Sequence, residues 1–166
     1  MLLERLQHNA AAPHAIQYWS LRRAEAVTRF AVSTSVARQE VAVKGDMKTY
    51  IRFSGSSCDA TVASWEGKCF YRIARPNQFD PNIKTVIPTY PMPDYPSGHA
   101  STGGAMWAML AHLFPREANA FHSKAEECAT SRLWAGIHVR SACYTGLALG
   151  RAVASRVIER ASAQGA

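Results

Sequence analysis

The chain has 166 residues, of which 48% are apolar and 19% charged, a composition typical of a globular domain and unlike that of a disordered chain. The net charge of +7 favours anionic partners, but the arginines are scattered, which argues against nucleic-acid binding. No apolar stretch is long enough to cross a bilayer, and no signal peptide is visible. We therefore expect a cytoplasmic protein, or an exported one if a leader has been removed.

The apolar periodicity predicts an all-α fold, with a polar arm over residues 1–14 and one helical domain over residues 15–166. Residues 39–53 are ambiguous between strand and helix, and Ser54–Ser57 is predicted to be a turn. Residues 76–96 form a proline-rich loop, and a loop of that length is unusual in a compact domain unless it is functional. Helices are expected over residues 15–39, 58–74, 98–114, 116–133 and 139–163.

The first segment whose residues suggest a chemical function runs from Lys68 to Arg75. These two cations are seven residues apart, or two helical turns, so they are predicted to lie on one helix face. Two cations on one face repel each other unless an oxyanion lies between them. The alternative is a pair of solvated charges on a surface helix.

The second segment, Pro96-Ser97-Gly98-His99, lies where the proline-rich loop ends and a helix of small residues begins. The free N–H groups and the dipole of a helix start favour an anion there. Ser97 adds a hydroxyl and His99 an imidazole. Taken alone, the pattern is more often that of a helix cap and a turn.

The third segment places Arg132 at the end of one predicted helix and His138 at the start of the next, with Gly136 between them for the turn. Together the three segments resemble the signatures KxxxxxxRP, PSGH and SRxxxxxHxxxD. These belong to the superfamily of vanadium-dependent haloperoxidases, type 2 phosphatidic acid phosphatases and bacterial acid phosphatases. The resemblance covers about residues 57–155 and is nearest to the bacterial haloperoxidase-like branch.

The resemblance implies a helical bundle with an oxyanion site between central helices, fed by the proline-rich loop. His138 would attack phosphorus or coordinate vanadium at one apex, and His99 would act at the other. Positive charge around three equatorial oxygens, with nucleophile and leaving group in line, is what phosphoryl transfer requires. The resemblance assigns the equatorial oxygens of phosphate or vanadate to Lys68, Arg75, Ser97, Gly98 and Arg132.

Three functions remain open at this point. The first is a vanadate-dependent haloperoxidase that oxidises halide with hydrogen peroxide. The second is an acid phosphatase that hydrolyses phosphomonoesters through a phosphohistidine at His138 and needs no cofactor. The third is an inactive relic that only binds oxyanions.

The sequence departs from the signature at one position, because Ala142 stands where the superfamily has an aspartate four residues after His138. That carboxylate accepts a hydrogen bond from the histidine's other nitrogen, and the analogous loss in serine proteases lowers turnover about 10⁴-fold. Either another group compensates, or the chain is a weak or inactive member. The chain is also short for the superfamily, and three explanations stay open: a fragment, a degenerate copy, or a domain completed by forming a homodimer.

Overall fold

A computed structural model describes residues 15–17 and 47–163. The polar arm predicted over residues 1–14 and most of the helix predicted over residues 15–39 lie outside the described residues. Within the described ranges every regular element is a helix, which confirms the all-α prediction. The elements are α5 (Met47–Tyr71), α6 (Pro76–Phe79), α7 (Gly98–Leu113), the 3₁₀ helix η2 (Pro115–Glu117), α8 (Ala118–Trp134) and α9 (Arg140–Ala163).

The helices α7 and α9 begin within one residue of the predicted positions, but α5 differs from the prediction at both ends. The predicted turn at Ser54–Ser57 is wrong, because α5 runs through it. Inside the helix, Ser56 donates its hydroxyl hydrogen bond to the carbonyl of Phe53 at 2.9 Å, so the serine is satisfied without a turn. At its other end α5 stops at Tyr71 rather than at residue 74.

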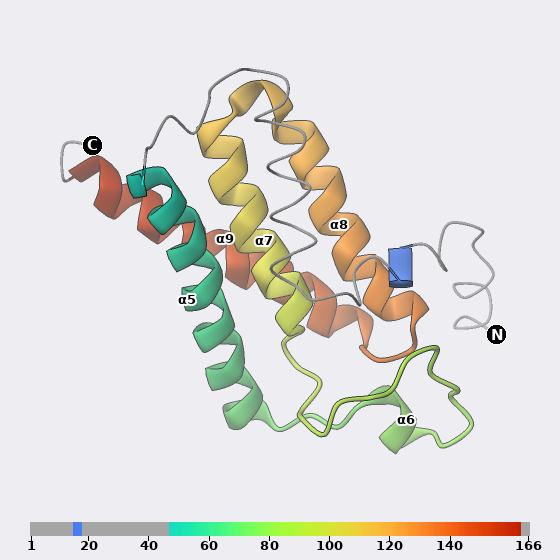
Figure 1. Cartoon of the computed structure of the whole chain (residues 1–166). Helices are drawn as coiled ribbons and strands as arrows, with labels where there is room; N and C mark the ends of the chain where they lie inside the picture. The colour runs from blue at the N-terminus through green and yellow to red at the C-terminus, as the bar shows by residue number, and fades with distance from the viewer. Residues whose placement is uncertain (1–14, 18–46, 164–166) are drawn as a thin grey trace.

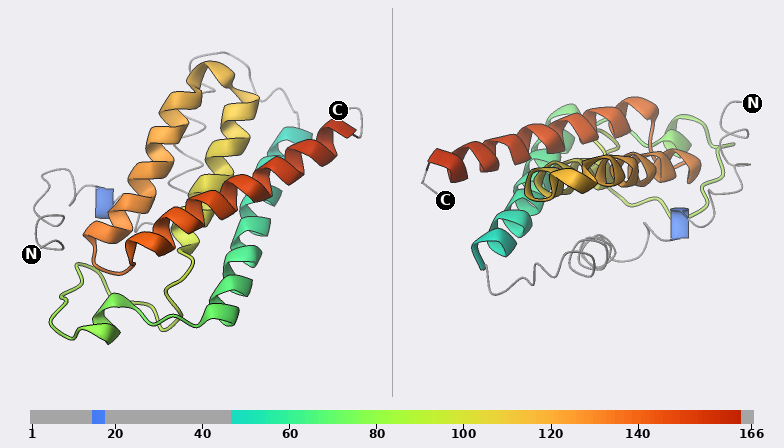
Figure 2. Two further views of the ribbon diagram at one scale, coloured as in Figure 1. Left: turned by 180° about the vertical axis from the view of Figure 1, so that it is seen from behind. Right: turned by 90° about the horizontal axis from the view of Figure 1, so that it is seen from above.

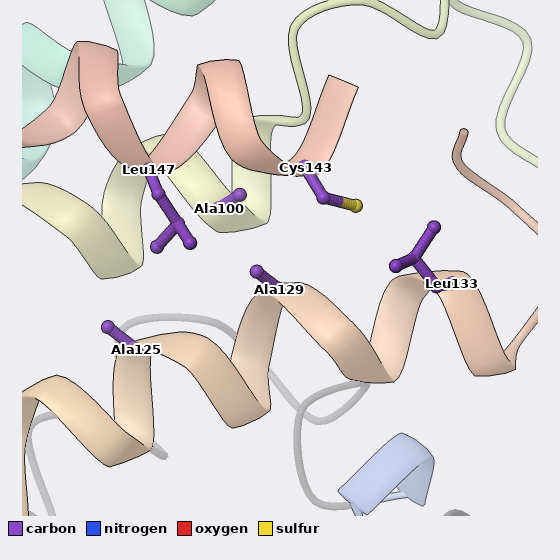
Figure 3. Packing of buried hydrophobic residues seen from close by; sticks show 6 residues of the cluster. All are labelled: Ala100, Ala125, Ala129, Leu133, Cys143 and Leu147. Atoms are coloured by element: carbon purple, nitrogen blue, oxygen red, sulfur yellow. The ribbon is translucent and has the colours of Figure 1, made fainter. Parts of the chain in front are cut away.

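Helix α7 is the centre of the bundle and contacts α5, α8 and α9, with α9 as its most extensive partner (Figure 1). Seen from behind and from above, α9 crosses one face of the layer that α7 and α8 form (Figure 2). Small side chains fill the space between these three helices (Figure 3). The buried cluster consists of Ala100, Ala125, Ala129, Leu133, Cys143 and Leu147.

Glycines let the backbones of α7 and α9 touch. A Cβ at Gly146 would lie 2.7 Å from the carbonyl oxygen of Ser97, and a Cβ at Gly150 would overlap the carbonyl of Ser101. Only glycine permits such a close approach. The start of α7 is therefore held against α9 by backbone contact.

Four helix ends meet at one end of the bundle. The C-termini of α5 and α8 and the N-termini of α7 and α9 all lie there (Figure 1). Beside them lies the segment of residues 72–97, in which the loop predicted from residue 76 begins with the short helix α6. The three signature segments occupy these ends, so the fold brings together residues that are far apart in the sequence.

Candidate active site

Ser97 is the N-cap of α7, as the sequence suggested. Its Oγ accepts from the backbone N–H of Ala100 at 3.4 Å, and its own N–H donates to the carbonyl of Ala142 at 2.9 Å. Gly98 and His99 are the first two residues of α7, and both line a small pocket. The hydroxyl of Ser97 caps the helix and is not among the groups that line this pocket.

Lys68 and Arg75 line the same pocket, although the reason given from helical spacing is wrong. Helix α5 ends at Tyr71, and Arg72 has a left-handed φ of 47°, so the chain turns before Arg75. Arg75 is instead the N-cap residue of the short helix α6. The turn of the chain, and not a shared helix face, brings the two cations together.

Both cations are nearly fully buried and bind the far end of the proline-rich loop. The Lys68 ammonium donates to the carbonyl of Pro93 at 2.6 Å and to that of Asp94 at 3.0 Å. The Arg75 guanidinium donates through Nε to the carbonyl of Met92 at 3.0 Å and through an Nη to that of Ile137 at 2.8 Å. These bonds fix the loop against α5 and against the α8–α9 connection.

His138 lies in the α8–α9 connection, two residues before α9 begins. Gly136 makes the turn with a φ of 72°, as the sequence suggested. Arg132 is fully buried near the end of α8, where it donates to Oγ of Ser131 at 3.0 Å and to the carbonyl of Ile16 at 3.3 Å. The fold therefore places Arg132 close to the site but not on the pocket wall.

The pocket joins one residue or more from each signature segment. Lys68, Arg75, Gly98, His99 and His138 line it, and its volume is about 10 Å³. That is about enough for a single water molecule. Trp65, Tyr90 and Met92 complete the wall with larger side chains.

His138 is buried and uncharged at neutral pH. Burial is the main cause that lowers its pKa from 6.5 to about 4; Asp94 opposes this shift, and the nearby charges of Arg75 and Lys68 add to it. An Nη of Arg75 lies 2.9 Å from Nε2 of the ring. The same Nη lies 3.4 Å from Nδ1, so the guanidinium is beside both ring nitrogens and does not by itself fix which of them carries the proton.

Asp94 is the functional residue that the sequence analysis missed. Its side chain is fully buried, and its Oδ1 lies 2.7 Å from Nδ1 of His138. The sequence carries one signal for it, since Asp94 is a lone acidic residue among prolines three positions before Ser97. The carboxylate beside the histidine is thus present, although Ala142 stands at the expected position.

A family model described as the PAP2 superfamily matches residues 50–164. The chain belongs to the PAP2 superfamily. The match contains all three signature segments, which confirms the resemblance stated from the sequence. A comparison with curated protein sequences gives no match.

Two solved structures share the PAP2 fold with this chain. The first is described as the first bacterial vanadium-dependent iodoperoxidase, with a TM-score of 0.79 and 23% identity; the match covers 92% of this chain and 44% of that one. The second is described as the first transmembrane PAP2-type phosphatidylglycerolphosphate phosphatase from Bacillus subtilis, with a TM-score of 0.58 and 14% identity. That match covers 97% of this chain and 92% of the phosphatase. At these identities both comparisons show the fold alone.

The chain spans less than half the length of the iodoperoxidase. In the part of this chain that the structure describes, no helix is both long and apolar enough to span a membrane.

Proposed function

We propose that this PAP2 protein binds vanadate at His138 and acts as a haloperoxidase that oxidises halide with hydrogen peroxide. The observation that carries the proposal is the imidazole of His138. It is uncharged and lines a pocket together with two buried cations, Lys68 and Arg75. Such a site suits a tetrahedral oxyanion whose central atom accepts a nitrogen ligand.

The residues present fit vanadate by the chemistry of their donors. His138 would supply Nε2 to vanadium, and Lys68, Arg75 and the N–H of Gly98 at the start of α7 would bind its oxygens. Arg75 would have to move from Nε2 onto an oxygen of the anion, because its Nη now occupies that side of the ring. Bound vanadate would supply the activation of peroxide for a two-electron oxidation.

The overall reaction converts hydrogen peroxide, a halide ion and one proton to hypohalous acid and water. The halide loses two electrons and the O–O bond of peroxide accepts them. We assign delivery of the consumed proton to the imidazole of His99, since His99 shares the pocket with His138. Lys68 and Arg75 would hold negative charge in place throughout.

The size of the pocket favours the haloperoxidase over a phosphatase. Its open space is about that of one water molecule, and the side chains of Trp65, Tyr90 and Met92 border it. Vanadate would itself need the pocket to open, as Arg75 moves, and halide and peroxide are small enough to approach it then. An organic phosphoester would need still more room, because its leaving group must also fit.

A second candidate is an acid phosphatase, and the uncharged imidazole of His138 supports it as well. Nε2 would attack phosphorus while the bond to the leaving oxygen breaks, and His99 would give that oxygen a proton. Water would then attack the phosphohistidine, release phosphate and restore the free imidazole. The third candidate, an inactive relic, loses its main argument because Asp94 stands beside His138.

The test begins with binding of orthovanadate to the purified protein, followed by two assays on the same preparation. Vanadate-dependent oxidation of bromide or iodide by peroxide would support the haloperoxidase. Hydrolysis of an aryl phosphate that vanadate inhibits would support the phosphatase instead. His138→Gln should abolish either activity, whereas His112→Gln, at an exposed position of α7, should retain it. Failure of the wild type to bind orthovanadate would refute the proposal.

A further inference from the structure

We propose that Asp94 is the positioning residue for His138, and that it supplies from the loop the carboxylate that the superfamily signature carries four residues after the histidine. The proposal deepens the function proposed above and rests on it. Asp94 would touch neither substrate nor oxyanion, because it is not part of the pocket wall. It would act through the ring of His138.

The two oxygens of Asp94 hold the ring and the backbone next to it. Oδ1 lies 2.7 Å from Nδ1 of His138, and Oδ2 accepts from the N–H of Val139 at 3.3 Å. Val139 follows His138 directly, so its bond to Oδ2 keeps the carboxylate beside the ring. A small rotation of the imidazole would direct its Nδ1–H at Oδ1, which accepts no hydrogen bond in the present geometry.

The carboxylate itself is held in place by α5 and by the turn that follows it. The N–H of Asp94 donates to the carbonyl of Ile73 at 2.7 Å, and the carbonyl of Asp94 accepts from Lys68 at 3.0 Å. An Nη of Arg75 lies 3.7 Å from Oδ1. Because the backbone on both sides of its Cα is bonded, Asp94 cannot follow the ring if the ring turns.

The small residue at position 142 helps to explain how Asp94 reaches His138 from the loop. The side chain of Ala142 is fully buried, and its carbonyl accepts from the N–H of Ser97 at 2.9 Å. The start of α9 therefore lies directly against the loop that carries Asp94. A small residue at 142 leaves room for this approach.

The consequence for chemistry is a fixed tautomer. A carboxylate only accepts, so the ring must present its N–H at Nδ1 to Asp94 and keep its lone pair on Nε2. The Nη of Arg75, 2.9 Å from Nε2 and 3.4 Å from Nδ1, is near enough to donate to that lone pair. This tautomer leaves a lone pair on Nε2 for a ligand in the pocket that His138 lines.

Asp94→Asn tests this without changing the shape of the side chain. The backbone N–H of Val139 can only donate a hydrogen bond, so it would keep the amide oxygen of Asn as its acceptor. The NH₂ group of Asn would then face Nδ1. His138 would then accept at Nδ1 and carry its proton on Nε2, which is the exchange that the same substitution causes in a serine-protease triad. Asp80→Asn is the matched control, because Asp80 is an exposed residue of the same loop.

Two measurements decide the proposal. Long-range ¹H–¹⁵N NMR on the wild type, without added anion, should place the His138 proton on Nδ1; Asp80→Asn should leave it there and Asp94→Asn should move it to Nε2. Orthovanadate, which needs the lone pair, should bind about 10–100-fold more weakly to Asp94→Asn. Inorganic phosphate, which needs the cations and the helix N–H groups, should still bind.

A wild-type proton on Nε2 would overturn the proposal, and that measurement requires no variant to fold. So would an Asp94→Asn protein that keeps both the wild-type tautomer and the wild-type affinity for orthovanadate. If the wild type binds neither anion, the proposed function is wrong, while the tautomer measurement still judges the role of Asp94.

Discussion

The burial of His138 predicts a specific loss of stability on acidification. Its pKa is about 4 in the folded protein against 6.5 for an ordinary histidine. Between these values the unfolded chain binds a proton that the folded protein does not, so the contribution is complete above pH 6.5 and is lost as the pH falls toward 4. The gap between 6.5 and about 4, at about 1.4 kcal/mol per pH unit, corresponds to about 3 kcal/mol.

The effect is best measured between pH 7 and pH 5, because most carboxyl groups begin to titrate below that window. Over this window the two pKa values give a loss of about 2 kcal/mol in the free energy of unfolding. Urea denaturation of the wild type and of His138→Gln at both pH values, in phosphate-free buffers, isolates the contribution of His138 to this loss. The wild type should lose about 2 kcal/mol more than His138→Gln.

His112→Gln controls for the removal of an imidazole from an exposed position of α7. An equal pH dependence for the wild type and His138→Gln would refute the reasoning. It would mean that His138 takes up its proton as easily in the folded protein as in the unfolded chain.

The close contact of α7 with α9 makes a second prediction. Gly150→Ala should lower the free energy of unfolding by about 1–3 kcal/mol or more, since its methyl group would meet backbone atoms of α7. Gly55→Ala in α5, with nothing within 4 Å of the new methyl, should raise it by up to about 1 kcal/mol, as chemical denaturation would show. A third prediction concerns the reaction of the cysteines with a thiol reagent. Cys58 and Cys69 are exposed and should react with maleimide in the native protein. Cys143 should react only after unfolding, because burial raises its pKa to about 12; rapid labelling of Cys143 in the native state would contradict its burial.

The sequence was sufficient to predict the helical class, the bounds of α7 and α9, and the segments that form the site. These depend on local patterns: the proline-rich approach to Ser97, the run of small residues after it, and Gly136 before His138. The start of α5 could not be predicted, because its apolar spacing fits strand as well as helix and its serines suggest a turn. In the structure a serine of that stretch bonds back to its own helix.

The arrangement of Lys68 and Arg75 was predicted for a reason that does not hold. Seven-residue spacing places two residues on one helix face only while the helix continues, and α5 ends between them. The contact of Asp94 with His138 could not be predicted from the sequence, for a related reason. Nothing in the sequence of an irregular segment says which way the side chain of Asp94 points, and the ring it meets lies 44 residues further along the chain.

The position of Asp94 also bears on how relatives of this protein would be sought. A search that demands an aspartate four residues after the motif histidine would pass over this chain, or class it as inactive, because it finds Ala142 there. The pairing of Asp94 with His138 indicates a different criterion: an acidic residue three positions before the serine of PSGH, together with a small residue at the vacated position. In sequences that meet this criterion, the carboxylate beside the motif histidine would come from the segment before PSGH and not from the position four residues after the histidine.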